Sequence, residues 1–136
     1  MLFRSNFITA FRFFPNAQPE LRKEVMGLLR LHLEDNGYLV FNNHKNTGSC
    51  RNRLYKLFNK GSKGMSVDEV KDLISENKLE LVKTYHLGVF PAAESRTLLP
   101  IFLLRPVDKL LSKCRFLQNY GENLIFVCRH FKSHKE

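Results

Sequence analysis

The sequence is short of the residues that stabilise small secreted domains, and it has no long apolar run. Its three cysteines are an odd number, whereas secreted domains of this size pair their thiols, so Cys50, Cys114 and Cys128 are expected to be reduced. The longest apolar stretch, residues 98–104, is interrupted by Pro100 and is far shorter than the roughly 18 residues of a membrane-spanning helix. We therefore expect a cytoplasmic chain that makes no membrane contact.

Several enzyme motifs are also missing. The sequence contains no Walker loop, no G-x-G-x-x-G turn and no nucleophile elbow. No internal repeat is visible, which excludes solenoids and arrays. The 136 residues suffice for one domain, with a polar tail from about residue 130, and a chain of this length needs no metal or disulfide to fold. We expect no cofactor and no bound metal.

Tryptophan is absent, and phenylalanine takes its place as the main aromatic residue. Twelve Phe residues among 43% hydrophobic residues predict a core built from flat rings that stack or meet edge to face. The first 18 residues contain arginine and no acid, which also fits an amphipathic transit peptide. The alternation of Phe7, Thr9, Phe11 and Phe13 favours a β-strand instead.

Periodicity and turn residues predict the order β-α-β-α-α-β-β-α-β. Pro19 opens the first helix, which Asn36-Gly37 ends, and Ser66 with Glu69 forms a capping box for a later helix. The remaining predicted elements are a strand at 38–41, an exposed loop at 42–50, a helix at 51–59, strands at 79–90 and 98–104 joined by a hairpin loop at 91–97, a helix from Pro106, and a strand at 124–128. This order predicts an α+β domain with about four helices packed on one face of a mixed or antiparallel sheet.

The charge distribution is the main functional signal. The chain carries 22 Lys and Arg against 13 Asp and Glu, a net charge of +9, and residues 42–65 hold six bases and no acid. Such a basic segment attracts polyanions. The candidate nucleic-acid-binding residues are Lys45, Arg51, Arg53, Tyr55, Lys56, Lys60 and Lys63. Arg53, Lys56 and Lys60 share one predicted helix face, and Tyr55 is placed to stack on an unpaired base.

The sequence therefore predicts a non-enzymatic nucleic-acid-binding domain with a regulatory role as one option, leaving DNA and RNA both open. A helix-turn-helix is disfavoured, because the second helix carries Asp68, Glu69, Asp72 and Glu76. Those acids favour the second hypothesis, an adaptor or inhibitor that binds another protein.

A third hypothesis is a small metal-independent nuclease built from His86, Glu94, Arg96 and His130. Glu80 and Lys83 faintly resemble the acid and lysine of metal-dependent nucleases, but no second carboxylate follows at a suitable spacing. Zinc binding by Cys114, Cys128, His130 and His134 is disfavoured because no paired C-x₂₋₄-C motif is present.

Overall fold

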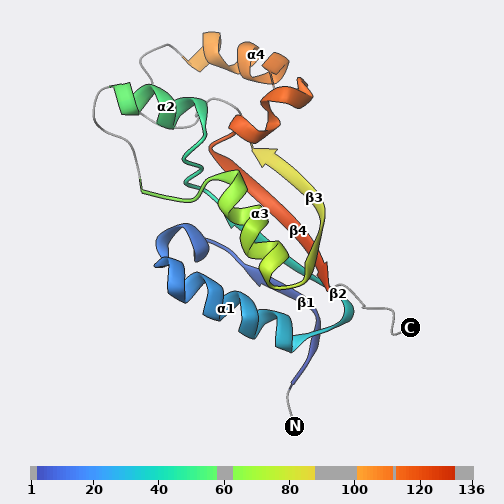
Figure 1. Cartoon of the computed structure of the whole chain (residues 1–136). Coiled ribbons are helices and arrows are strands. Elements are labelled where there is room, and N and C mark those ends of the chain that lie inside the picture. Colours follow the sequence, from blue (N-terminus) through green and yellow to red (C-terminus); the bar gives the residue numbers. More distant parts are fainter. Residues whose placement is uncertain (1–2, 58–62, 88–100, 112, 131–136) are drawn as a thin grey trace.

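The computed structural model describes residues 3–57, 63–87, 101–111 and 113–130 (Figure 1). Its elements, in chain order, are β1 (Ser5–Ala10), η1 (Phe14–Asn16), α1 (Pro19–His32), β2 (Leu33–Asn43), α2 (Cys50–Leu57), α3 (Val67–Glu76), β3 (Leu79–Leu87), α4 (Ile101–Leu111), η2 (Arg115–Tyr120) and β4 (Asn123–His130). The predicted α+β class, with a mixed sheet and four helices, is confirmed.

The four strands form one sheet in the order β1-β2-β4-β3. β1 and β2 are parallel and are joined through α1, whereas β4 runs antiparallel to both β2 and β3. β1, β2 and β3 therefore all finish at the same edge of the sheet, where β4 begins. β4 lies between β2 and β3 and pairs with both of them. β2 and β3 are therefore consecutive in the chain but not neighbours in the sheet.

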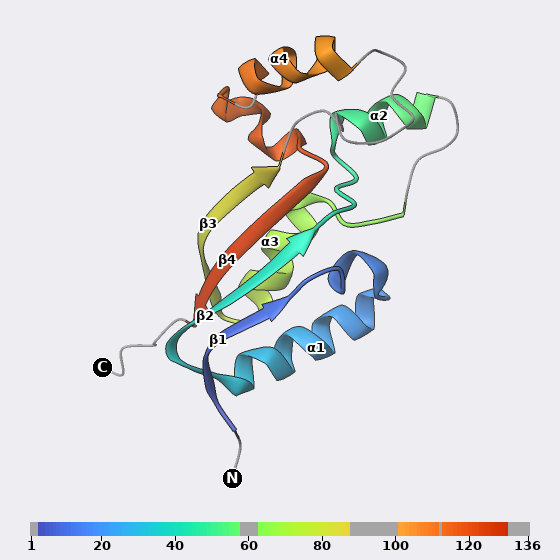
Figure 2. The ribbon, with the colours of Figure 1, turned by 180° about the vertical axis from the view of Figure 1, so that it is seen from behind.

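The helices are unevenly distributed around this sheet. α1 and α3 lie together over one face, and the two views agree on this arrangement (Figures 1 and 2). α2, α4 and η2 lie beyond the edge at which β1–β3 end (Figure 1). Seen from behind, the strands have no helix in front of them in the part of the chain that the structure describes (Figure 2).

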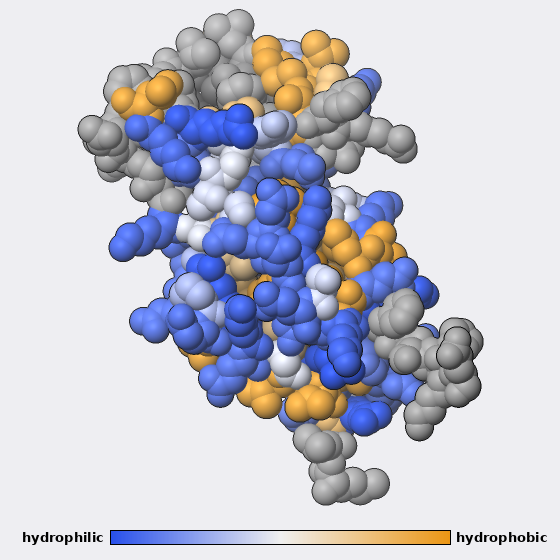
Figure 3. Space-filling view, in the orientation of Figure 1, coloured by the Kyte–Doolittle hydropathy of each residue, from blue (hydrophilic) through white to orange (hydrophobic). Residues whose placement is uncertain are grey.

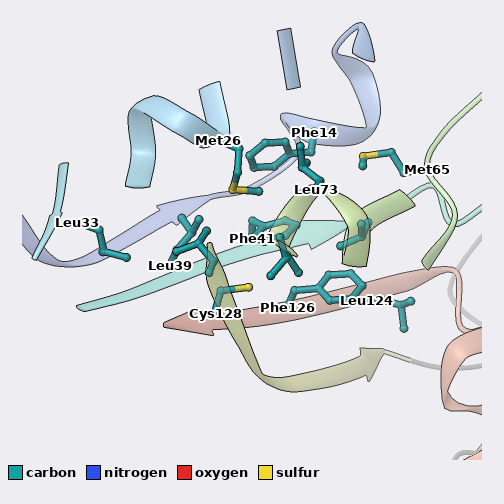
Figure 4. Close-up of a cluster of buried hydrophobic side chains, with 13 residues drawn as sticks. Phe14, Met26, Leu33, Leu39, Phe41, Met65, Leu73, Leu124, Phe126 and Cys128 are labelled. Atoms are coloured by element: carbon teal, nitrogen blue, oxygen red, sulfur yellow. The ribbon is translucent and has the colours of Figure 1, made fainter. Parts of the chain in front are cut away.

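The core fills the space between the two helices and the sheet. Phe41 lies between Phe14 and Phe126, with ring centroids 4.9 and 5.5 Å away respectively, and all three rings are fully buried (Figure 4). Met26 of α1 and Leu73 of α3 close the core from the helix side. The core is thus a ladder of phenylalanine rings between one helix layer and one sheet, as the composition predicts.

Two helix boundaries predicted from local sequence patterns, the start of α3 and the end of α1, can be compared with the structure. The capping box at α3 is confirmed: the Ser66 hydroxyl accepts from the Glu69 amide at 3.1 Å, and the Ser66 amide donates to the Glu69 carboxylate at 2.6 Å. The predicted end of α1 is wrong. The helix stops at His32 and β2 begins at once, because buried Leu33 pairs with Ser5 of β1. Asn36, at φ 66°, makes the left-handed turn within β2.

The predicted strand at 98–104 and the predicted helix start at Pro106 are both wrong. Residues 101–111 form a single helix, α4, with Pro106 inside it. A seven-residue apolar run does not distinguish a strand from a helix, and β3 pairs with β4 rather than with this segment. The hairpin loop predicted at 91–97 lies outside the described residues.

Some burial predictions are also wrong. The predicted exposed loop at 42–50 contains four buried polar residues, Asn42, Asn43, Asn46 and Ser49. The three- and four-residue spacing of apolar residues along the two helices predicts inward-facing leucines, but Leu21 and Leu28 on α1 and Leu57 on α2 are exposed. Leu57 is 79% exposed because α2 lies beyond the sheet edge rather than on the core. None of the described helices is long and apolar enough to cross a membrane.

The packing of Phe41 between Phe14 and Phe126 leads to a prediction about stability. Replacing Phe41 by Ala removes the central ring and leaves a cavity between Phe14 and Phe126, so we expect the free energy of unfolding to fall by about 3–5 kcal/mol. Urea unfolding at constant pH measures this loss. The matched control is Phe102→Ala on α4, where the ring is 73% exposed and a change below about 0.5 kcal/mol is expected. Equal losses in the two variants would contradict this packing.

Candidate active site at the carboxyl ends of the parallel strands

The candidate site lies at the edge of the sheet where β1, β2 and β3 end. In α/β sheets, ligands bind outside the carboxyl ends of parallel strands, where the connecting loops diverge. Polar residues gather at this edge in the present chain: Arg12 follows β1, Asn42 and His44 lie at the end of β2, and Asn123 begins β4.

The turn after β1 is sharply bent. Arg12 has a left-handed backbone, with φ 62°, which is unfavourable for a residue with a side chain. Two hydrogen bonds hold this conformation: the Arg12 amide donates to the Asn42 Oδ1 at 2.6 Å, and the Asn16 Nδ2 donates to the Arg12 carbonyl at 2.7 Å. The bend places the first residues after β1 against the end of β2.

Asn42 connects three strand ends through a single side chain. Its Oδ1 accepts from the Arg12 amide, and its Nδ2 donates to the Asn123 Oδ1 at 3.2 Å. Only 6% of Asn42 is exposed, so each lost bond would leave a buried polar group unsatisfied. The amide thus fixes the ends of β1, β2 and β4 relative to one another.

Three further asparagines fix the chain that follows β2. The Asn43 Nδ2 donates to the Met65 carbonyl at 2.8 Å, and the Asn52 Nδ2 donates to the Thr47 carbonyl at 2.7 Å. The Asn46 Nδ2 reaches the carbonyls of Asn119 and Gly121, each at 2.8 Å. These bonds explain why a segment rich in turn-forming residues is buried rather than exposed.

Gly64 is required where this segment meets the start of α3. Met65 and Asn46 form an isolated parallel bridge, in which the Met65 amide donates to the Lys45 carbonyl at 3.2 Å. A Cβ atom at position 64 would collide with the backbone of Lys45. The glycine therefore permits the close approach that holds residues 45–47 in place.

His44 is the titratable residue that this framework presents at the edge. Burial, and then the neighbouring positive charges of Lys45 and Arg12, lower the pKa of His44 below its ordinary value, while Glu122 acts in the opposite direction. The Nδ1 of His44 is buried and has no hydrogen-bond partner among the described residues. A neutral imidazole has one ring nitrogen that can accept a proton or a hydrogen bond.

The charged groups around His44 are held by defined partners. The Lys45 Nζ donates to the Asn16 Oδ1 at 2.6 Å, which places its charge near the turn after β1. Glu122 accepts two bonds from the Arg51 Nη1, at 2.9 and 3.0 Å, in a partly buried ion pair. Arg51 offsets much of the Glu122 charge, so the cationic influence of Lys45 and Arg12 prevails at His44.

The residues predicted to bind nucleic acid do not form a uniform basic face. Arg51 is paired with Glu122, the Arg53 guanidinium lies 4.8 Å from the centre of the Tyr120 ring, and Lys45 contacts Asn16. Lys56 and Lys63 are exposed. Lys60 lies outside the described residues, as does the side chain of Tyr55. Ligand contact by these seven residues stays a prediction.

The other predicted constellations are not brought together. His86 pairs with Leu124 and His130 pairs with Leu79, so the two histidines lie at opposite ends of the β3–β4 ladder. Glu94, Arg96 and His134 lie outside the described residues. Glu80 pairs with Arg129 at 2.6 Å. Cys128 is in the core, where burial raises the pKa of its thiol to about 12. No three His, Cys, Asp or Glu residues of the described chain group as metal ligands.

Sequence reasoning missed Asn42, His44, Glu122 and Asn123. Asn42 and His44 fell in a segment read as an exposed loop, since Asn, Thr, Gly and Ser are typical of turns. The available signal was the position of Asn-Asn-His directly after the short apolar run Tyr38–Phe41, where a strand ends. The sequence does not reveal that β1 and β2 are parallel, and only this parallel pairing brings the ends of the two strands to the same edge of the sheet.

No family model and no curated protein sequence matches this chain. Solved structures of S-adenosylmethionine (SAM)-dependent methyltransferases do resemble it. A SAM-dependent methyltransferase from Methanosarcina mazei aligns with a TM-score of 0.60 and 10% identity, over 98% of this chain and 64% of that chain. An O-methyltransferase family 2 protein from Planctomyces limnophilus, in complex with apigenin, aligns with a TM-score of 0.58 and 11% identity, over 94% and 31% of the respective chains.

A third methyltransferase, from Archaeoglobus fulgidus, has a TM-score of 0.51 and 12% identity, over 93% of this chain and 59% of that chain. At these identities the likeness concerns the fold alone. The chain thus has a methyltransferase-like fold, and it spans less than two thirds of each of these proteins.

These neighbours contradict the prediction of a non-enzymatic nucleic-acid-binding regulator. The three similar structures described above are methyltransferases and not nucleic-acid-binding regulators. The composition was misleading because part of the basic segment serves intramolecular contacts: Arg51 pairs with Glu122, and Arg53 lies over Tyr120. Net charge describes the surface as a whole and does not identify the ligand.

The environment of His44 generates a prediction about stability and pH. Because the folded protein lowers the pKa of His44, the unfolded chain binds the proton more readily as the pH falls through about 6.5. Wild type should therefore lose more unfolding free energy between about pH 7.5 and about pH 5.5 than His44→Gln does. Chemical denaturation at the two pH values measures the difference. A His44→Gln variant that retains the full wild-type pH dependence would contradict this prediction.

Proposed function

We propose that this chain forms the acceptor-binding part of a SAM-dependent methyltransferase, in which His44 takes the proton from the hydroxyl group to be methylated. The observation that carries the proposal is the half-buried His44, whose pKa is lowered, at the carboxyl edge of parallel strands in a fold that methyltransferases share. Asn42 and the ends of the strands position the residue.

The protonation state of His44 suits it to act as a general base. A lowered pKa leaves the imidazole neutral near pH 7, so a ring nitrogen has a free lone pair when the acceptor arrives. Removing the hydroxyl proton increases the nucleophilicity of the acceptor oxygen. The negative charge of Glu122 raises the pKa of His44 and so stabilises the imidazolium that results.

The charges at this edge indicate the class of acceptor. Arg12 and Lys45 favour an anionic substituent such as a carboxylate, and Lys45 is already oriented by Asn16. A base of histidine strength suits an acidic hydroxyl, such as that of a phenol or catechol. We therefore propose a phenolic acid as the acceptor class.

The described residues do not fit the cofactor itself. The turn from β1 into α1, residues 11–18, contains no glycine, whereas strand-to-helix turns that cradle nucleotide cofactors use glycine so that the backbone can approach closely. Phe14, within that turn, is fully buried in the core. Arg12 and Lys45 would also repel a sulfonium group. No step is assigned to SAM on these residues.

We also propose a cytoplasmic location. All three cysteines are free thiols, and Cys128 is deeply buried and poorly reactive because burial raises its pKa.

Binding of a phenolic acid tests the proposal. The probe is 3,4-dihydroxybenzoate, with catechol as the comparison that lacks the carboxylate. NMR titration should shift the side-chain amides of Asn42 and Asn123, and the carboxylate-bearing probe should bind more tightly. Replacing Lys45 by Gln should weaken its binding about fivefold, the effect of losing roughly 1 kcal/mol of charge attraction.

The matched control is Lys63→Gln, an exposed lysine that should leave the affinity unchanged. Two results would overturn the proposal: shifts confined to residues elsewhere, or an affinity that Lys45→Gln and Lys63→Gln reduce equally.

A further inference from the structure

We propose that the end of the molecule formed by α2, α4 and η2 is a peripheral docking surface for anionic membranes. In this arrangement α4 lies among the lipid headgroups, its exposed apolar side chains enter the acyl region, and the surrounding bases contact lipid phosphates. The inference goes beyond the proposed function and does not depend on it, because contact with lipid requires no methyl transfer.

Almost all of the net charge belongs to the segments that contain α2, α4 and η2. Residues 42–65 and 101–122 contain ten Lys and Arg but only two acids, Asp108 and Glu122. The rest of the chain is nearly neutral, with 12 bases and 11 acids. Glu122 is itself paired with Arg51. The exposed bases on α2, on α4 and just after α4 are Arg53, Lys56, Arg105, Lys109 and Lys113.

The same end of the molecule exposes large apolar side chains. Leu57, the last residue of α2, is 79% exposed, and Phe102 and Leu110 on α4 are 73% and 69% exposed. Figure 3 shows hydrophobic surface over α4 next to strongly hydrophilic surface over α2. Exposed apolar surface bordered by charged residues is typical of a contact surface, and here the partner must match both kinds of side chain.

The order of residues along α4 places bases beside the apolar side chains. Phe102, Arg105 and Lys109 are separated by three and four residues, so they lie on one face of the helix. Lys113 follows four residues after Lys109. The long side chain of Lys or Arg keeps its methylene groups with apolar neighbours while its charge reaches the headgroup phosphates. This pattern suits a helix that lies in a membrane interface.

An anionic membrane fits this surface better than an acidic protein does. The exposed apolar side chains come from two separate helices, α2 and α4, and a fluid lipid surface receives them without matched pockets. The cytoplasmic leaflet carries anionic lipids, which attract clustered Lys and Arg residues. Charge and apolar surface thus favour the same partner.

The proposed contact is peripheral. α4 has 11 residues, about half the length that a membrane-spanning helix needs. The sequence led us to expect no membrane contact because it lacks a long apolar run, but a helix that lies in the interface needs no such run. We therefore replace that expectation with contact through one end of the molecule.

Vesicle co-sedimentation of the purified chain tests this surface. The probes are vesicles of phosphatidylcholine alone and vesicles of phosphatidylcholine mixed with phosphatidylserine. We expect binding to the mixed vesicles, weakened by added salt, and much weaker binding to the neutral vesicles. Equal binding to the two kinds of vesicle, or no binding to the mixed vesicles at low salt, would overturn the proposal.

Substitutions of exposed apolar residues locate the contact. The double variant Phe102→Ala, Leu110→Ala should bind the mixed vesicles about tenfold more weakly, because both side chains lose burial in the acyl region. The matched control is Leu28→Ala, Leu31→Ala on α1, where the leucines are 48% and 52% exposed, and it should bind as wild type does. Equal losses in the two double variants would place the contact elsewhere and refute the assignment to α4.

Substitution of one base tests the contribution of charge. Arg105→Gln should weaken binding to the mixed vesicles about fivefold, the effect of removing one base near an anionic surface. Lys71→Gln, at an exposed position on α3, is the control and should leave the affinity unchanged. A loss that is the same for both variants would contradict a docking surface confined to this end.

Fluorescence distinguishes insertion from attachment by charge alone. The chain contains no Trp, so Phe102→Trp places a single reporter on α4. Its emission should shift to shorter wavelength with the mixed vesicles, whereas that of Leu28→Trp should not. An unshifted emission at position 102 in the vesicle-bound protein would overturn the proposal. Binding to soluble polyglutamate, without binding to vesicles, would also overturn it and would identify an acidic protein as the partner.

Discussion

The side-chain amide of Asn42 is the interaction on which the arrangement of this molecule depends. It accepts from the Arg12 amide and donates to Asn123, so it joins the ends of three strands that come from distant parts of the chain. The left-handed turn at Arg12 is unfavourable by itself, and the hydrogen bond from the Arg12 amide to Asn42 stabilises it. His44 lies two residues after Asn42. Its partly buried surroundings include the positive charge of Arg12, which the same turn positions.

The parts of the fold that local sequence patterns determine were predictable. The capping box at Ser66 and Glu69 identifies the start of α3, and Pro19 identifies the start of α1. The α+β class follows from the order of such elements. The end of α1 was not predictable from local signals, because Leu33 joins β2 through its burial and its pairing with β1. The same holds for α4, whose apolar run suits a strand as well as a helix.

The candidate site was hidden for a related reason. Asparagines after a short strand are typical of an exposed turn, and only the parallel pairing of β1 with β2 converts them into a buried network. The basic residues of 42–65, by contrast, are conspicuous in the sequence, yet Arg51 and Arg53 contact Glu122 and Tyr120 within the chain. Among the described residues, one edge and one face of the sheet are left uncovered beside the candidate site.

The pKa of His44 is the most direct measure of this account, because the proposed base catalysis requires a neutral imidazole near pH 7 and the buried network surrounds that ring. NMR titration of the ring nitrogens should give a pKa below the ordinary histidine value, with the imidazole neutral near pH 7. Lys45→Gln should raise that pKa by removing a neighbouring positive charge. A pKa at or above the ordinary value, unchanged by Lys45→Gln, would contradict the account.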